Sequence, residues 1–113
     1  MLSIEALKEY GADVKAGLLR CMGNEAFYLR MVGMILKDPA FEKLFAAAER
    51  GDAKEGFEAA HALKGSVGNL ELTPILEPVI TLTEIYRAGE TADPELVEQV
   101  KTAYERLKSL SEE

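Results

Sequence analysis

Signals that begin and end helices recur along this chain, and no segment shows the alternation of a strand. A capping side chain directly before a proline starts a helix, because the proline ring suits the first helical position. Gly51 stands where a glycine ends a helix, and Asp52 with Glu55 resembles a capping box. The chain is therefore predicted to be all-α. Three capping pairs of the first kind occur: Asp38-Pro39, Thr73-Pro74 and Asp93-Pro94.

These signals and the spacing of the apolar residues divide the chain into seven helices. They are expected at residues 3–9, 12–22, 25–37, 40–50, 53–69, 74–88 and 94–110. Because short loops between long helices favour antiparallel neighbours, the expected fold is an up-and-down antiparallel four-helix bundle. Its predicted members are 25–37, 53–69, 74–88 and 94–110, with the additional short N-terminal helices and 40–50 packed on its outside.

Composition narrows the class of protein. The 113 residues, 48% of them hydrophobic, are predicted to form a single domain, 1–113, with a core bundle at about 20–110. The net charge of −7 argues against binding nucleic acid or an anionic membrane. The single cysteine, Cys21, is predicted to be a small buried hydrophobe. With no basic, apolar leader and no apolar run of about 20 residues, we expect a cytoplasmic monomer.

The only histidine, His61, lies in the middle of the helix predicted at 53–69. Its neighbours at i+3, i+4 and i+7 are Lys64, Gly65 and Gly68. Glycine inside an exposed helix costs about 1 kcal/mol relative to alanine, so two glycines on one face need a reason. The reason favoured here is access, because another protein can approach an imidazole closely where side chains are missing.

These residue types suit a phosphate carrier. A neutral imidazole nitrogen is nucleophilic near neutral pH, and an ammonium at Lys64 can offset the charge of a phosphoryl group on His61. The competing interpretation takes His61 as an ordinary surface residue, Lys64 as a solvated charge and Gly65 as a packing notch. Residue types alone leave both interpretations open.

The run from Ala60 to Ser66, AHALKGS, resembles the signature of histidine-containing phosphotransfer (HPt) domains, A-H-x-L-K-G followed by Ser or Ala. The resemblance covers about residues 20–110 and implies a four-helix bundle in which His61 accepts phosphate. It implies a phosphocarrier that is no independent enzyme, with a response-regulator receiver domain or a histidine kinase as partner. Mg²⁺ is expected on the receiver, and no cofactor or metal ion on this chain. Glu71 is a departure, since the family commonly has glycine after the Asn-Leu pair.

An antiparallel hairpin of 53–69 and 74–88 predicts further neighbours of the histidine. Thr83 is expected to hydrogen-bond the imidazole or the phosphate, and Arg87 is expected to add positive potential. Two apolar residues in the same stripe are expected to be partly exposed and to suit transient docking. A solvated helix face is the competing interpretation. The whole stripe is Leu76, Ile80, Thr83 and Arg87.

The leading hypothesis is a phosphorelay intermediate in two-component signalling. His61 would take a phosphoryl group from a kinase or a receiver phospho-aspartate and pass it to a receiver aspartate. An alternative is a non-catalytic helical module that binds a signalling partner. A di-iron carboxylate bundle needs two Glu-x-x-His pairs, and only Glu58 with His61 fits. The chain lacks a phosphate-binding loop of the GxxxxGK[ST] type, so self-phosphorylation from ATP is not expected.

Overall fold

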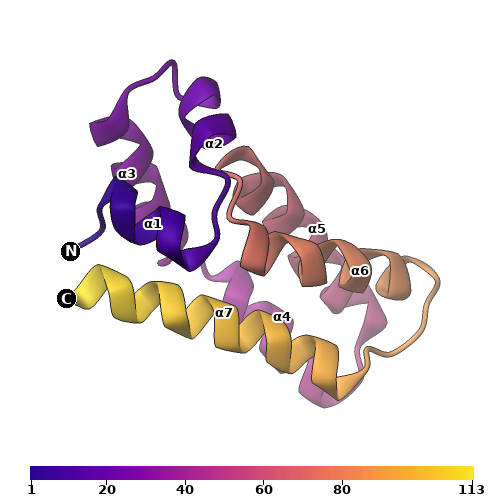
Figure 1. The fold of residues 1–113 in the computed structure, drawn as a ribbon. Coiled ribbons are helices and arrows are strands. Elements are labelled where there is room, and N and C mark those ends of the chain that lie inside the picture. Colours follow the sequence, from indigo (N-terminus) through magenta and orange to yellow (C-terminus); the bar gives the residue numbers. More distant parts are fainter.

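The computed structural model describes all 113 residues, and every regular element in it is an α-helix (Figure 1). The helices lie close to the seven predicted segments, so the prediction of an all-α chain is confirmed. None of them has the length and apolarity that a bilayer crossing needs. They are α1 (Ile4–Tyr10), α2 (Val14–Arg20), α3 (Glu25–Ile35), α4 (Ala40–Arg50), α5 (Ala53–Asn69), α6 (Thr73–Arg87) and α7 (Pro94–Glu112).

Local capping explains most of these boundaries. The Asp52 side chain accepts the Glu55 N–H at 3.1 Å and so begins α5. Gly51 ends α4 in the left-handed region, with a φ of 66°, as a glycine does readily. Thr73 differs from the prediction, because it is the first residue of α6 and makes no capping hydrogen bond. Its hydroxyl instead donates to the Glu71 carbonyl at 3.4 Å.

Four helices, α4 to α7, form the bundle. Helix α5 packs against both α4 and α6, and α7 contacts α6 and α4 and so closes the bundle. The Phe41 and Tyr104 rings stack across it, with centroids 4.0 Å apart. A single hydrophobic core therefore runs through all four helices. Its fully buried side chains include Phe41, Leu44, Leu63, Val67, Ile75, Val79, Leu82, Val100 and Leu107.

The membership of the bundle differs from the prediction at one helix. The segment 40–50, expected outside the bundle, is its member α4, whereas 25–37, expected inside, corresponds to α3 and packs beside α2. The short connection at residues 51–52 folds α4 directly back on α5, which leaves no place for α3 there. Helix α4 suits the position because its buried residues lie on one side: Ala40, Phe41, Leu44 and Ala47.

The helices α1 to α3 form an addition at one end of the bundle, where both chain termini also lie (Figure 1). Three buried tyrosine hydroxyls join this addition to the bundle by donating to backbone carbonyls. The pairs are Tyr10 with Ala103 (2.7 Å), Tyr28 with Leu70 (2.9 Å) and Tyr104 with Leu36 (3.0 Å). Each hydroxyl satisfies a polar group that would otherwise be buried without a partner.

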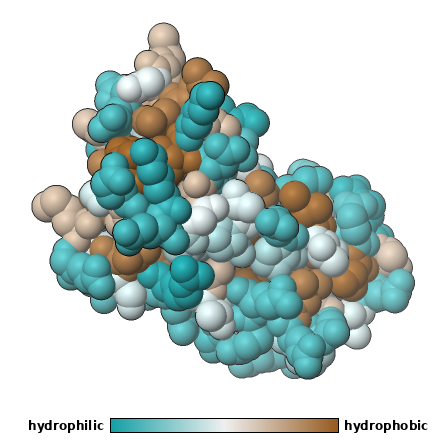
Figure 2. Space-filling view, in the orientation of Figure 1, coloured by the Kyte–Doolittle hydropathy of each residue, from teal (hydrophilic) through white to brown (hydrophobic).

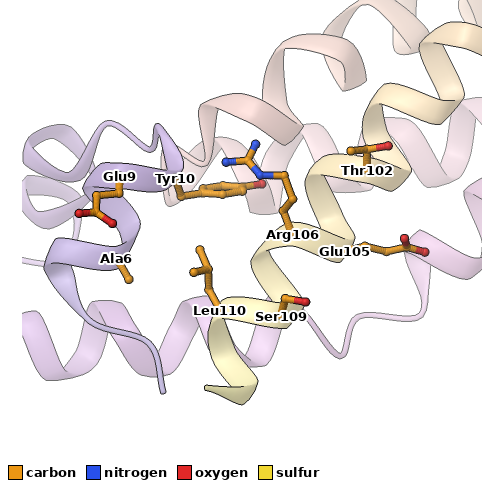
Figure 3. A pocket seen from close by; sticks show the side chains of 8 residues that line it. All are labelled: Ala6, Glu9, Tyr10, Thr102, Glu105, Arg106, Ser109 and Leu110. Carbon is orange, nitrogen blue, oxygen red and sulfur yellow. The ribbon is translucent and has the colours of Figure 1, made fainter.

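Figure 3 shows the contact of α1 with α7 from close by. Arg106 of α7 lies over the Tyr10 ring, with its guanidinium carbon 5.0 Å from the ring centroid. Burial raises the pKa of the Tyr10 hydroxyl above its ordinary value. A hollow of about 510 Å³ lies here between the two helices, and His61 is not among its lining residues.

The turn between α5 and α6 is tied to α2 through Glu71. This residue has a φ of 54°, a left-handed conformation that glycine adopts without cost and other residues adopt at about 1 kcal/mol. Its carbonyl accepts the Asp13 N–H at 3.0 Å, and its carboxylate pairs with Arg20 at 3.1 Å. Glu71 thus anchors the N-terminal addition to the turn between α5 and α6.

We predict that alkaline pH destabilises this addition through Tyr28. Burial, with smaller contributions from nearby acidic groups, raises the pKa of Tyr28 to about 12. The unfolded chain releases this proton near pH 10, so the free energy of unfolding falls as the pH rises from about 10 to about 12. In Tyr28→Phe the free energy of unfolding should fall by on the order of 2 kcal/mol less over this pH range, because the titrating hydroxyl is gone. At neutral pH the variant should be about 1 kcal/mol less stable, because the hydrogen bond to Leu70 is lost.

Urea unfolding followed by circular dichroism across this pH range measures both effects. The variant should be less stable than the parent protein at neutral pH, and the two curves should meet and then cross as the pH rises toward 12. Two parallel curves would contradict the assignment.

Candidate functional site

The candidate site centres on His61, whose side chain is exposed in the middle of α5. The opposite face of the same helix is buried against α4 and α6 and consists mostly of small residues. His61 therefore belongs to the solvent side of a helix that the core holds firmly. The buried residues of α5 are Gly56, Ala59, Ala60, Leu63 and Val67.

The imidazole of His61 stacks on the ring of Phe57, one turn earlier in α5. The two ring centroids lie 5.4 Å apart, and the ring planes are inclined by 14°. The Arg87 guanidinium carbon, from α6, lies 5.0 Å from the Phe57 centroid. Arg87 also pairs with Glu84 of its own helix at 3.3 Å. Phe57 thus orients the imidazole and connects it with a cation on the neighbouring helix.

Two contacts establish how α5 and α6 are aligned. One is the approach of Phe57 to Arg87, and the other is that of Gly68 to Leu76, whose Cδ1 lies 3.6 Å from a Cβ built at Gly68. In an antiparallel pair these contacts place His61 opposite about residue 83. The antiparallel hairpin of these two segments that the sequence predicted is therefore confirmed.

The surface next to His61 is open at Gly65. A Cβ built at Gly65 meets no other atom within 4 Å, so this position offers free space at i+4 from the histidine. Lys64, at i+3, is half-buried, which leaves part of its side chain on the surface. Gly68 is less open, because a Cβ there would make an ordinary contact with Leu76. The access that the sequence predicted is therefore provided mainly by Gly65.

Thr83 does not reach this surface. Its side chain is fully buried, and its hydroxyl donates to the Val79 carbonyl of the same helix at 2.8 Å. The prediction that Thr83 supports the imidazole or a phosphate is therefore wrong. The physical reason is the rotation of α6, which turns this position toward the core, where an intrahelical hydrogen bond satisfies the hydroxyl.

Apolar side chains are partly exposed around the site, as predicted. Ile80 is 40% exposed, and Leu76 is half-buried. A shallow hollow of about 520 Å³ adjoins Phe57 on the side toward the start of α5, and Lys54 and Arg87 supply its cations. Apolar surface with a polar rim is the usual composition of a transient protein–protein interface.

The sequence pattern missed the roles of two residues. The first is Phe57, which is half-buried and stacks on His61. Its spacing of four residues from the histidine on one helix is the signal that could have revealed this contact. The second is Gly56, where a Cβ would lie 2.7 Å from the Tyr86 ring. Glycine at this position lets α6 approach α5 closely. The Tyr86 ring is buried in this contact, and its burial raises the pKa of the Tyr86 hydroxyl.

The arrangement provides one exposed nitrogen nucleophile, two nearby cations and open surface beside them. Nowhere in the chain do three or more His, Cys, Asp or Glu side chains gather in a way that could hold a metal ion. The groups present can carry an anionic substituent on His61 and offset part of its charge. The side chain stacked against the imidazole is Phe57, which is neither an acid nor a base.

Comparison with known families gives one match. The family model described as the Hpt domain matches residues 38–110, which is more than half of the chain. The match begins directly before α4 and extends through most of α7, so it contains the four bundle helices and excludes α1 to α3. No curated protein and no solved structure matches the chain.

We predict that Phe57 determines the magnetic environment of His61. Replacement of the stacked ring in Phe57→Leu should move the His61 ring-proton resonances downfield, because the shielding by the aromatic face is lost. Phe57→Tyr keeps an aromatic ring and should leave these resonances nearly unchanged. Proton–carbon correlation NMR of the single histidine measures the effect, and identical spectra of all three proteins would contradict the stack.

Proposed function

Since this chain belongs to the Hpt domain family, we propose that it carries a phosphoryl group on His61 within a two-component signalling system. The observation that supports the proposal most is the exposed imidazole beside the open surface at Gly65, inside the matched range. The family acts with histidine kinases and receiver domains, so these are the proposed partners. The protein itself is a phosphocarrier module and not an enzyme in the usual sense.

The proposed transfer needs only one nucleophile from this chain. A lone pair on the neutral imidazole attacks the phosphorus of a receiver phospho-aspartate, the N–P bond forms, and the P–O bond to the aspartate breaks. The aspartate leaves as a carboxylate, and the reverse step on another receiver restores the free imidazole. A phosphohistidine of a kinase can donate in the same way. Mg²⁺ held by the receiver supplies charge compensation that this chain does not.

Lys64 and Arg87 have different parts in the proposal. Lys64, one turn after His61 and half-buried, is placed to interact with the oxygens of a phosphoryl group. Arg87 acts through Phe57, on which its guanidinium rests, and adds positive potential at the edge of the site. Phe57 positions the imidazole by stacking, which limits its rotation and presents an edge to the partner.

The apolar surface beside His61 is the proposed docking surface for the receiver. Ile80 and Leu76 lie on α6 next to the open segment of α5, and burial of an exposed isoleucine on docking is favourable by roughly 1 kcal/mol. A surface of this limited size suits a complex that must dissociate after each transfer.

We predict that His61 alone accepts the label in a transfer assay. A set of receiver domains, each phosphorylated on its aspartate with radioactive phosphate, is incubated with the protein and Mg²⁺. The wild-type chain should acquire an acid-labile, base-stable label, and His61→Gln should acquire none. Lys64→Gln should still be labelled, but about tenfold more slowly, because one charge-assisted contact to the phosphoryl group is lost.

Two results would overturn the proposal. One is a label that persists in His61→Gln, and the other is the absence of label with every receiver and kinase tested. Stable binding of a receiver without transfer would instead favour the non-catalytic interaction module.

We predict opposite effects of Gly65→Ala on stability and on transfer. Alanine fits into the open space and has the higher helix propensity, so the free energy of unfolding should rise by about 0.5–1 kcal/mol. The added methyl group obstructs the partner beside His61, so transfer should slow by about tenfold or more. Ala62→Ser, which adds one atom at an exposed position toward α4, is the control and should leave transfer unchanged. Equal transfer rates for Gly65→Ala and the wild type would remove the access role of Gly65.

A further inference from the structure

The charge of this protein is distributed unevenly along the chain. Between residues 14 and 37, four basic residues and one acidic residue give a net charge of +3. The other 9 basic and 19 acidic residues give −10, which makes up the total of −7. The segment that contains α2 and α3 is therefore a basic region on an acidic protein.

The same part of the molecule exposes most of the large apolar side chains. Figure 2 shows hydrophobic side chains that reach the surface over α2 and α3. Of the six large hydrophobic residues that are well exposed, only Ile80 belongs to the bundle. The other five precede α4: Met1, Leu19, Met22, Phe27 and Met34.

Helix α3 carries two apolar faces, and the protein covers only one of them. Tyr28, Val32 and Ile35 are buried in the core. On the outer side, Phe27 and Met34 are 40% and 58% exposed and lie two turns apart. Two cations accompany this outer stripe: Arg30 follows Phe27 at i+3 within α3, and Lys37 lies in the turn just after the helix. The Arg30 guanidinium carbon lies 5.8 Å from the Phe27 ring centroid.

A groove of about 940 Å³ runs along this helix between the N-terminal residues and the end of α7. Leu29, Leu36 and Met34 give it an apolar lining, and a Cβ built at Gly33 meets nothing within 4 Å, so its middle is open. Three cations line the groove: Arg30, Lys37 and Lys108. An apolar groove with cations along it has the composition of a site that receives an amphipathic helix.

We propose that this groove binds an amphipathic helix of a partner protein whose apolar face is flanked by aspartate or glutamate. Arg30 in α3 and Lys37 in the turn just after it both line the groove and are seven residues apart, so they can face carboxylates spaced at i and i+7 on a packed helix. The concave shape suits a helix better than a flat bilayer.

This surface is separate from the His61 site. The groove shares no residue with that site, and nearly all of its lining lies outside the range that the Hpt family model matches. Binding here adds a protein contact without covering the imidazole. The proposal therefore stands independently of phosphotransfer.

The test uses two labelled helical peptides of about 18 residues each, with leucines at i, i+3, i+4 and i+7 spacing. One peptide has glutamates flanking the leucines, and the other has lysines at the same positions. In fluorescence anisotropy at low salt, the wild-type protein should bind the glutamate peptide at least about tenfold more tightly than the lysine peptide. Charge reversal in Arg30→Glu with Lys37→Glu should abolish this preference, and Met34→Ser should weaken binding by about tenfold.

The control variants separate the groove from the rest of the surface. Lys43→Glu reverses an exposed charge on α4, Leu19→Ser removes an exposed apolar side chain outside the groove, and His61→Gln changes the other site. All three should bind the glutamate peptide as the wild type does. All of the substituted side chains are exposed, and thermal unfolding by circular dichroism verifies that each variant is folded.

Three results would overturn the proposal. The first is equal binding of the two peptides, or no binding of either. The second is binding that the groove variants leave unchanged. The third is a preference for vesicles of phosphatidylcholine with phosphatidylserine, or for a second copy of the chain in sedimentation, over the glutamate peptide.

Discussion

The close approach of α5 to α6 is the contact on which the rest of the site depends. Gly56 makes it possible, because any side chain there would overlap the Tyr86 ring. The small buried residues Ala59 and Ala60 continue the same face. Once the two helices are this close, their alignment brings Arg87 to Phe57, and Phe57 in turn supports His61. The chemistry at the surface is thus set by packing on the opposite side of the helix.

The bundle and the N-terminal addition are joined by hydrogen bonds as well as by apolar packing. Tyrosine hydroxyls reach from one part to backbone carbonyls of the other, and Glu71 ties the turn beside the site to α2. The family match begins at the same boundary, at residue 38. The chain therefore combines a bundle that lies within the family match with an N-terminal addition that lies outside it.

Both proposed binding surfaces contain residues that lower the stability of the folded protein. Gly65 weakens an exposed stretch of α5, and Ile80 leaves apolar area in water. On the addition, Met34 and Phe27 do the same. Residues that are less stabilising than the alternatives gather at these two surfaces, whereas the core is filled with apolar side chains. Such a distribution is typical of surfaces that bind a partner.

Local rules were sufficient for much of this protein. The helix positions and the neighbours of His61 at i+3 and i+4 follow from the sequence, because capping and the 3.6-residue period act over a few residues. The choice of α4 over α3 as a bundle member did not follow, since both are amphipathic enough to pack and only the chain path decides between them. The burial of Thr83 and the stacking of Phe57 also needed the tertiary structure. A modest rotation of a helix about its axis moves a side chain from surface to core, and only the fit against neighbouring helices determines that rotation.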